Sequence, residues 1–239
     1  MDWSDEGIIL SARAHGETAA VAEIFTRTHG RHLGLVYGGR SRRIRPILQI
    51  GNHVDATWKA RLSDHLGHFT LELRRGIAAE LMPDSFALNG LQSLIALTRL
   101  LPERDPHPSL YEVTLFVLGF MNDPSVWPAL MVRWELALLD ELGFGLELTS
   151  CAATGSTQEL IYVSPRSGRA VSRSAGEAYK DKLFALPSYL SMPGADVTAA
   201  DIKAGLAMTG YFLESRVLKP NELKLPEPRA RFIDAVKPG

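Results

Sequence analysis

The 239-residue sequence contains a single cysteine, Cys151. One cysteine cannot form an intrachain disulfide, and such sparse use is typical of proteins from a reducing cytosol. Long apolar runs are also missing, since no stretch approaches the roughly 18 uninterrupted apolar residues of a membrane span. The first ten residues, MDWSDEGIIL, are acidic where a secretory signal peptide is basic. We therefore expect a cytoplasmic protein with no membrane segment.

The motifs of common catalytic sites are absent. There is no G-x-x-x-x-G-K-[ST] or G-x-G-x-x-G phosphate loop, no nucleophile elbow and no H-E-x-x-H helix. Two histidine pairs, His29 with His32 and His65 with His68, have a spacing of three residues. A metal-dependent hydrolase acting through these pairs is one alternative, but no third and fourth ligand can be identified for either pair. We expect the protein not to be an enzyme.

Acidic residues are missing from one segment of a chain that is otherwise balanced, with 26 Lys and Arg against 27 Asp and Glu. No carboxylate lies between Glu23 and Asp55, and four arginines follow two glycines in GGRSRRIR, residues 38–45. A guanidinium group can donate two hydrogen bonds to one phosphate, so this cluster predicts an anion-binding loop. The alternative is a mobile, solvated loop. Aromatic residues nearby could stack on bases, but an aromatic on a strand is more often part of the core. These aromatics are Tyr37, Trp58 and Phe69.

The first 80 residues have the pattern of a small β domain. Short runs rich in β-branched and aromatic residues, separated by glycine or polar turns, predict five strands at residues 7–12, 19–28, 32–37, 53–62 and 68–74. Five short strands cover their edges best by closing on themselves, so we expect an OB-like five-stranded β-barrel over residues 1–80. An SH3-like barrel is the alternative.

Residues 81–239 have the pattern of an α-helical domain, which makes the fold class α+β. Apolar residues recur at intervals of three and four, and this predicts helices at residues 88–101, 110–121, 127–142, 176–186 and 198–218. Asp123 and Pro124 are expected to start the third helix, and Thr198 with Asp201 to form a capping box for the last. The proline-rich tail, residues 219–239, is expected to be an irregular strap or a partly disordered end.

A small insertion is expected at about residues 149–175. The spacing of Cys151, Thr154, Ser172 and Ala175 matches C-x2-C-x17-C-x2-C, a zinc-ribbon spacing in which three cysteines are replaced. Thr, Ser and Ala cannot supply the thiolates that tetrahedral zinc needs. We therefore expect a degenerate zinc-ribbon-like hairpin that binds no metal, and no cofactor.

The N-terminal motifs resemble those of the RecO family of bacterial recombination mediators. The residues that carry this resemblance are EGIIL at 6–10, Arg13, GE at 16–17, FT at 25–26, HGR at 29–31, GGRSRR at 38–43 and LQ at 48–49. Farther along, RWEL at 133–136, Leu139, LGF at 142–144, Cys151 and S-P-x-x-G at 164–168 look like the helical core and zinc-ribbon insertion of the same family. The resemblance covers nearly the whole chain.

The resemblance implies a non-enzymatic protein of DNA repair and recombination in the bacterial cytoplasm, associated with the nucleoid. Such proteins bind single- and double-stranded DNA, anneal complementary strands and, with RecR and the single-stranded-DNA-binding protein SSB, promote RecA loading. The predicted DNA-binding residues are Arg31, Arg40, Arg42, Arg43 and Arg45. Arg133 matches the family's R-x-F-E-like stretch and is the predicted contact for the SSB C-terminal tail, and its alternative role is a structural tie. A protein-protein adaptor with only secondary DNA contact is the alternative function.

Overall fold

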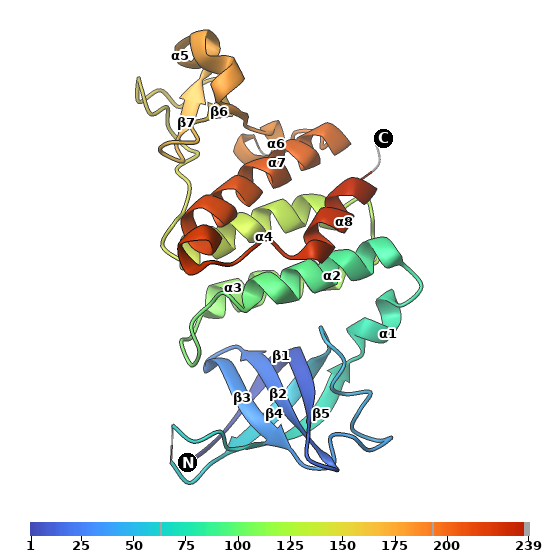
Figure 1. Ribbon diagram of the computed structural model, residues 1–239. Coiled ribbons are helices and arrows are strands. Elements are labelled where there is room, and N and C mark those ends of the chain that lie inside the picture. Colours follow the sequence, from blue (N-terminus) through green and yellow to red (C-terminus); the bar gives the residue numbers. More distant parts are fainter. Residues whose placement is uncertain (63, 193, 237–239) are drawn as a thin grey trace. The chain divides into compact units, whose positions relative to one another are not determined.

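The computed structural model describes residues 1–62, 64–192 and 194–236 of the chain (Figure 1). Strands come first and helices follow, so the fold is α+β, as predicted. The chain forms two units, Met1–Pro124 and Ser125–Gly239. The first unit includes the first three helices as well as the N-terminal strands.

Five strands of the first unit form a ring of pairings in the order β1-β2-β3-β5-β4. The strand β1 is long enough to pair antiparallel with both β2 and β4, while β3 and β5 meet at one parallel pair, Leu35 with His68. This order agrees with the predicted OB-like arrangement. The strands are β1 Asp2–His15, β2 Ala19–Thr26, β3 Gly30–Val36, β4 His53–Lys59 and β5 His68–Arg75.

Alternation along these strands places apolar side chains inside the ring. On β4, Val54, Ala56 and Trp58 are buried while Lys59 at the end of the strand is exposed. Trp58 and Phe69 are only 2% and 3% exposed, so both belong to the core.

Three helices complete the first unit: α1 Ile77–Leu81, α2 Ser85–Thr98 and α3 Pro108–Phe120. The Asp84 carboxylate caps α2 by accepting hydrogen bonds from the N–H groups of Phe86 at 2.8 Å and Ala87 at 3.3 Å. Pro108 occupies the first turn of α3, where a missing N–H costs nothing. The helices predicted at residues 88–101 and 110–121 are confirmed.

The second unit is built on α4 Trp127–Glu141, α7 Ala199–Phe212 and α8 Glu227–Ala235. Helix α4 buries the predicted face, with Trp127, Met131, Trp134 and Leu138 fully buried. It contacts α7, which continues as a π-helical stretch, Leu213–Leu218. The expected capping box at the start of α7 is present: Asp201 N–H donates to the Thr198 hydroxyl, and the Asp201 carboxylate accepts from Thr198 N–H.

A small antiparallel sheet in the order β7-β6-β8 confirms the hairpin expected within residues 149–175. Its strands are β6 Leu160–Val163, β7 Ala170–Ser172 and β8 Phe184–Ala185. Short helical pieces surround it: α5 Arg173–Gly176, a 3-10 turn at Glu177–Lys182 and α6 Ser188–Ser191. The helix predicted at residues 176–186 is wrong, because no residue of the 3-10 turn is buried and Phe184 pairs with Val163 as a strand instead.

Two further predictions about helix ends are wrong. Helix α4 starts at Trp127 with Pro128 in its first turn, so neither Asp123 nor Pro124 opens it. The tail forms a 3-10 turn, Lys219–Asn221, and the helix α8, where an irregular strap was expected. The last residues of the tail, 237–239, lie outside the described residues.

Candidate nucleic-acid interface

The arginine-rich segment belongs to a connection between β3 and β4 whose backbone is tied by its own hydrogen bonds. Ser41 N–H donates to the Gly38 carbonyl at 2.8 Å, and Arg45 N–H donates to the Ser41 carbonyl at 3.0 Å. Leu48 is 6% exposed and packs in the core of the ring of strands. The partly buried Ile44 packs against the same core. The segment is therefore anchored by apolar side chains rather than free in solvent.

Four of the five predicted DNA-binding arginines are exposed on this segment. They are Arg40, Arg42, Arg43 and Arg45. Arg40 is oriented by two carbonyls, since its Nη1 donates to Gly16 O at 3.1 Å and to Glu17 O at 2.9 Å. In the described part of the chain, no ion pair is recorded for any of the four. Their positive charges remain available to a polyanion.

A groove of about 650 Å³ runs beside this segment, and we call it the arginine groove. Arg13 from β1 joins Arg40 and Arg45 in its lining, where Ala14 and Leu48 provide apolar surface. The full lining set is Ala12, Arg13, Ala14, Ala20, Gly39, Arg40, Arg45, Leu48, Gln49 and Ile50. It contains three guanidinium groups and no carboxylate, and its volume falls in the range of small-molecule sites. This chemistry suits a nucleotide, with phosphate on the arginines and the sugar or base on the apolar wall.

Arg13 was absent from the predicted DNA-binding set. It is exposed near the end of β1, and the strand pairing of β1 with β2 brings it to the loop at residues 38–45. The available signal was that Arg13 is among the motif residues that carry the family resemblance.

Arg31, the fifth predicted DNA-binding arginine, does not lie with the other four. Its side chain is 12% exposed, its guanidinium contacts the buried carboxylate of Glu23, and its Nε donates to the Leu101 carbonyl at 2.7 Å. Arg99 from the end of α2 also binds Glu23, at 2.9 Å. Arg31 thus ties β2 and β3 to the end of α2, and its guanidinium is occupied by these contacts.

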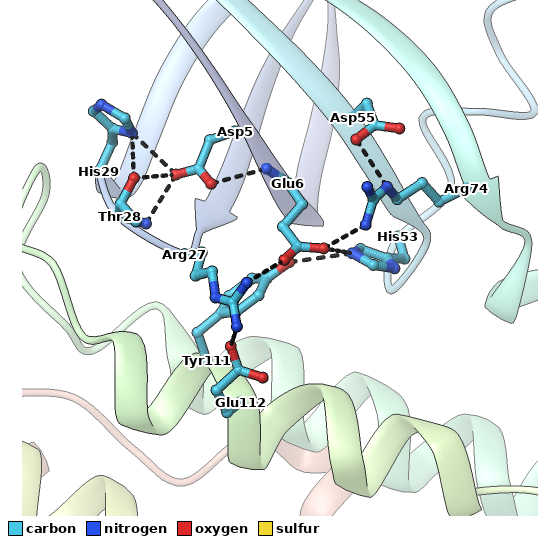
Figure 2. Close-up of polar contacts among 10 residues, drawn as sticks. All are labelled: Asp5, Glu6, Arg27, Thr28, His29, His53, Asp55, Arg74, Tyr111 and Glu112. Carbon is cyan, nitrogen blue, oxygen red and sulfur yellow. Dashed lines mark hydrogen bonds and ion pairs between the residues drawn. The ribbon is translucent and has the colours of Figure 1, made fainter.

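Other cations of the first unit are paired around Glu6 (Figure 2). The Glu6 carboxylate accepts from Arg27 at 3.0 Å and from Arg74 at 2.6 Å, and His53 Nε2 lies 3.2 Å from it. Arg27 reaches across to Glu112 on α3, and Arg74 also binds Asp55 at 2.8 Å. These arginines are neutralised by carboxylates, unlike those of the arginine groove.

The carboxylate of Asp5, close to this cluster, is stabilised in its charged form by hydrogen bonds. Burial would raise the pKa of Asp5, but hydrogen bonds from His29 and Thr28 outweigh it, and the pKa of Asp5 is lowered. Thr28 donates to Asp5 through both its N–H and its hydroxyl, each at 2.8 Å, and Trp3 stacks on His29 with ring centroids 4.1 Å apart. His29 is therefore engaged in a structural network rather than paired with His32.

Known protein families and known proteins match this chain over nearly its whole length. The family model for the recombination protein O N terminal matches residues 1–76, and the model for the recombination protein O C terminal matches residues 82–224. The protein named DNA repair protein RecO of Methylobacterium nodulans is 54% identical over 98% of this chain and 97% of its own. Those of Rhodopseudomonas palustris and Brucella abortus are 52% and 48% identical, each over 99% of this chain and 96% of its own.

The chain belongs to the RecO family. Membership in this family supports a role in DNA repair and recombination. It also confirms the family resemblance that the sequence motifs predict.

Arg133, the residue matched to the RecO family's R-x-F-E-like stretch, is exposed on α4. Its Nη2 donates to the Tyr189 carbonyl, and its guanidinium carbon lies 5.6 Å from the centre of the Tyr189 ring. The buried Glu135 nearby binds Arg229, at 2.8 Å, and not Arg133. Arg133 is thus positioned within the second unit and carries no recorded carboxylate partner in the described ranges.

The ribbon-like insertion holds its shape with hydrogen bonds. Cys151 Sγ accepts from Ser172 N–H at 3.3 Å and lies 3.5 Å from the Ser172 hydroxyl oxygen. Burial would raise the pKa of the Cys151 thiol, but hydrogen bonds from Ser172 and Thr154 lower it to about 6. One thiol, two hydroxyls and the methyl group of Ala175 do not form a zinc donor set. The residues at these four positions therefore do not fit a zinc ion.

Neither histidine pair forms a ligand cluster in the structure. His32 is buried among aromatic rings, while His65 and His68 lie at a hollow on the ring of strands. Among residues 1–62, 64–192 and 194–236, no group of three or more His, Cys, Asp or Glu could hold a metal ion. In the same ranges, no helix has the length and apolar character needed to cross a lipid bilayer.

Proposed function

We propose that the protein is a DNA-binding mediator of DNA repair and recombination, and that it acts through the arginine groove and the exposed arginines beside it. The observation that carries this proposal is a group of five exposed arginines for which the described residues provide no carboxylate partner: Arg13, Arg40, Arg42, Arg43 and Arg45. Because guanidinium groups bind phosphates without reading bases, the protein binds single- and double-stranded DNA of any sequence.

Strand annealing follows from the same chemistry. Two complementary strands repel each other until their phosphates are neutralised, and a protein that binds both with little sequence preference lowers that repulsion. No covalent bond is made or broken in this process, so the proposed function needs no catalytic residue and no cofactor. Family membership further supports RecR, the SSB tail and RecA loading as the context of this activity.

The test is a comparison of two charge-matched variants of the full chain. In the first, Arg40, Arg42, Arg43 and Arg45 are all changed to alanine. In the second, four exposed cations of the second unit are removed: Arg166, Lys182, Lys203 and Lys224. DNA affinity is measured by fluorescence anisotropy over a salt series, and annealing with complementary strands with and without SSB.

The first variant is expected to lose affinity for every DNA tested, and its salt slope to fall by about 0.7–0.9 for each phosphate contact removed. The second variant is expected to bind and anneal like the unchanged protein. Equal DNA binding by the first variant and the unchanged protein would refute the assignment of this surface. Little DNA binding by the unchanged protein near physiological salt would favour the adaptor function instead.

A further inference from the structure

The most exposed aromatic side chain of the first unit, among the residues that the structure describes, follows a strand of the ring. Tyr37, directly after β3, is 68% exposed, more than any other aromatic residue in the described ranges. Trp58 and Phe69, the two other aromatic residues that the sequence offers for base stacking, are buried in the ring. A single exposed aromatic is ordinary on a protein surface, so the surroundings of Tyr37 decide what it means.

Tyr37 lies at the edge of a hollow of about 310 Å³, which we call the Tyr37 hollow. Its lining residues are Tyr37, Lys59, Ala60, Arg61, His65, Gly67 and His68. Lys59 and Arg61 are exposed, and in the described part of the chain neither has a recorded ion pair. Asp2 is the partner of Lys59 in the strand register, but no carboxylate belongs to the lining. Proteins that bind single-stranded nucleic acids combine cations with an exposed aromatic ring in this way.

The wall of the hollow is fixed by the strand pairing. His68 pairs with Leu35 on β3 and with Lys59 on β4, so it lies between the strand that precedes Tyr37 and the strand that ends at Lys59. Leu35 N–H donates to the Gly67 carbonyl at 3.0 Å, and the Trp58 indole N–H donates to the Leu66 carbonyl at 3.0 Å. Such a wall loses little conformational freedom when a ligand binds.

Gly67 is required in this wall. Its φ is +62°, and a Cβ atom there would lie 2.5 Å from the Trp58 ring. Beside it, the rings of His68 and Tyr37 have centroids 5.6 Å apart with planes inclined by 51°, which leaves the exposed ring of Tyr37 accessible to a second aromatic partner.

The Tyr37 hollow adjoins the arginine segment along the chain. Only Gly38 and Gly39 separate Tyr37 from Arg40, so the two Cα atoms lie within about 11 Å of each other. A strand whose phosphate binds Arg40 therefore reaches Tyr37 with a neighbouring nucleotide.

We propose that Tyr37 is a stacking platform for an unpaired base, with Lys59 and Arg61 binding the phosphates that flank it. This inference rests on the proposed function and adds the form of nucleic acid that the surface prefers. In a duplex, both faces of a base are covered by its neighbours, whereas an unpaired base can place one face on the ring. The arginines bind both forms, and Tyr37 adds affinity for single strands alone.

The experiment compares Tyr37→Ala, Tyr37→Leu and Tyr37→Phe in the full chain. Each is titrated against a fluorescein-labelled, mixed-sequence single strand and against the corresponding duplex. The alanine and leucine variants are expected to lose affinity for the single strand on the order of 10-fold and to keep their affinity for the duplex. The phenylalanine variant keeps the ring and is expected to bind both probes like the unchanged protein.

A second measurement needs no variant. A single strand that carries 5-iododeoxyuridine is cross-linked to the unchanged protein by light, and the protein is then digested with trypsin. The label is expected on the peptide of residues 32–40, which ends at Arg40 and contains Tyr37.

Equal losses on both probes, full single-strand binding by the alanine variant, or a cross-link confined to other peptides would each overturn the stacking role. If the four-arginine variant loses DNA binding while Tyr37→Ala loses none, the stacking role is wrong and the proposed function stands. If the unchanged protein binds neither probe, both are wrong.

Discussion

Glu135 of α4 and Arg229 of α8 form an ion pair that is almost completely removed from water. Arg229 Nε donates to Glu135 Oε1 at 2.8 Å, and Nη2 donates to Oε2 at 2.8 Å. The Glu135 side chain is fully buried and that of Arg229 is 4% exposed. Nη2 also donates to the Leu206 carbonyl of α7 at 2.6 Å, so the pair joins three helices of the second unit.

Arg229→Ala is expected to destabilise the second unit by about 3–5 kcal/mol, because it leaves the Glu135 carboxylate buried without its counter-charge. Urea unfolding measures the loss. The double variant Glu135→Leu with Arg229→Leu is expected to lose less than the sum of the two single changes, since it leaves no buried charge unpaired. Arg231→Ala, which breaks the exposed pair with Glu227, serves as the control and is expected to cost at most about 1 kcal/mol. Equal losses for Arg229→Ala and Arg231→Ala would contradict this account.

His32 makes the stability of the first unit depend on pH. It is 5% exposed, and neither ring nitrogen has a hydrogen-bond partner among the residues that the structure describes. Burial, with smaller contributions from Arg104 and His29, lowers the pKa of His32 from 6.5 to about 4. The unfolded chain therefore binds a proton that the folded chain does not, and stability is lost as the pH falls from about 6.5 to about 4.

The loss assigned to His32 amounts to about 3 kcal/mol over that range. His32→Phe keeps an aromatic ring in the same cluster and removes the titration. Its urea midpoint is expected to change less than that of the unchanged protein between about pH 7 and pH 4.5. Hydrogen exchange of peptides from β1 reports the transition of the first unit by itself. Parallel pH profiles for the two proteins would show that His32 does not titrate in this way.

The sequence predicts the structural features that depend only on residues close together in the chain, such as helix caps and the buried face of a helix. The caps at Asp84 and Thr198 and the apolar face of α4 each follow from a few residues and the period of a helix. The tail differs from its prediction because its prolines do not exclude a helix. Pro228 lies in the first turn of α8, where proline is tolerated, and Phe232 is fully buried.

The candidate site was only partly predictable, because it depends on contacts between distant parts of the chain. The segment at residues 38–45 has no local acid, and its arginines are exposed as expected. The position of the Arg31 side chain depends on its contacts with Glu23 on the neighbouring strand and with the carbonyl of Leu101, which is 70 residues away. Arg13 enters the groove only through the pairing of β1 with β2. A pattern of charges along the chain does not contain these pairings.

The variants Arg13→Ala and Arg31→Ala are expected to have different effects on DNA binding and on stability. Arg13→Ala is expected to leave stability unchanged and to lower the salt slope of single-strand binding by about 0.7, because it removes one exposed phosphate contact. Arg31→Ala is expected to cost on the order of 2 kcal/mol of stability, since the buried Glu23 keeps Arg99 as its cation and the Ser11 hydroxyl as a further donor but loses Arg31, and to leave the DNA affinity of the folded protein unchanged. Anisotropy titration and urea unfolding of both variants provide the comparison. A loss of DNA affinity confined to Arg31→Ala would reverse the assignment.

Arg133→Ala tests the proposed contact with the SSB tail. Removing a charged hydrogen-bond donor is expected to weaken binding of a labelled SSB C-terminal peptide on the order of 10-fold. Binding of bare DNA should not change, because Arg133 is in the second unit and the arginine groove is in the first. Arg231→Ala, on α8, provides the matched control. Equal peptide binding by the Arg133 variant and the control would remove Arg133 from the contact.

The ribbon-like insertion is expected to keep its fold without zinc. Backbone hydrogen bonds from Ala152 N–H to the Ala170 carbonyl and from Ala170 N–H to the Glu147 carbonyl, both at 2.8 Å, tie the hairpin to the preceding segment. Elemental analysis of the purified protein should find no stoichiometric zinc, and a chelator should leave its thermal unfolding unchanged. Restoring the three thiols with Thr154→Cys, Ser172→Cys and Ala175→Cys is expected to create zinc binding and a chelator-sensitive transition, because four thiolates at this spacing form a structural zinc site. Stoichiometric zinc in the unchanged protein would mean that other residues complete the site with Cys151.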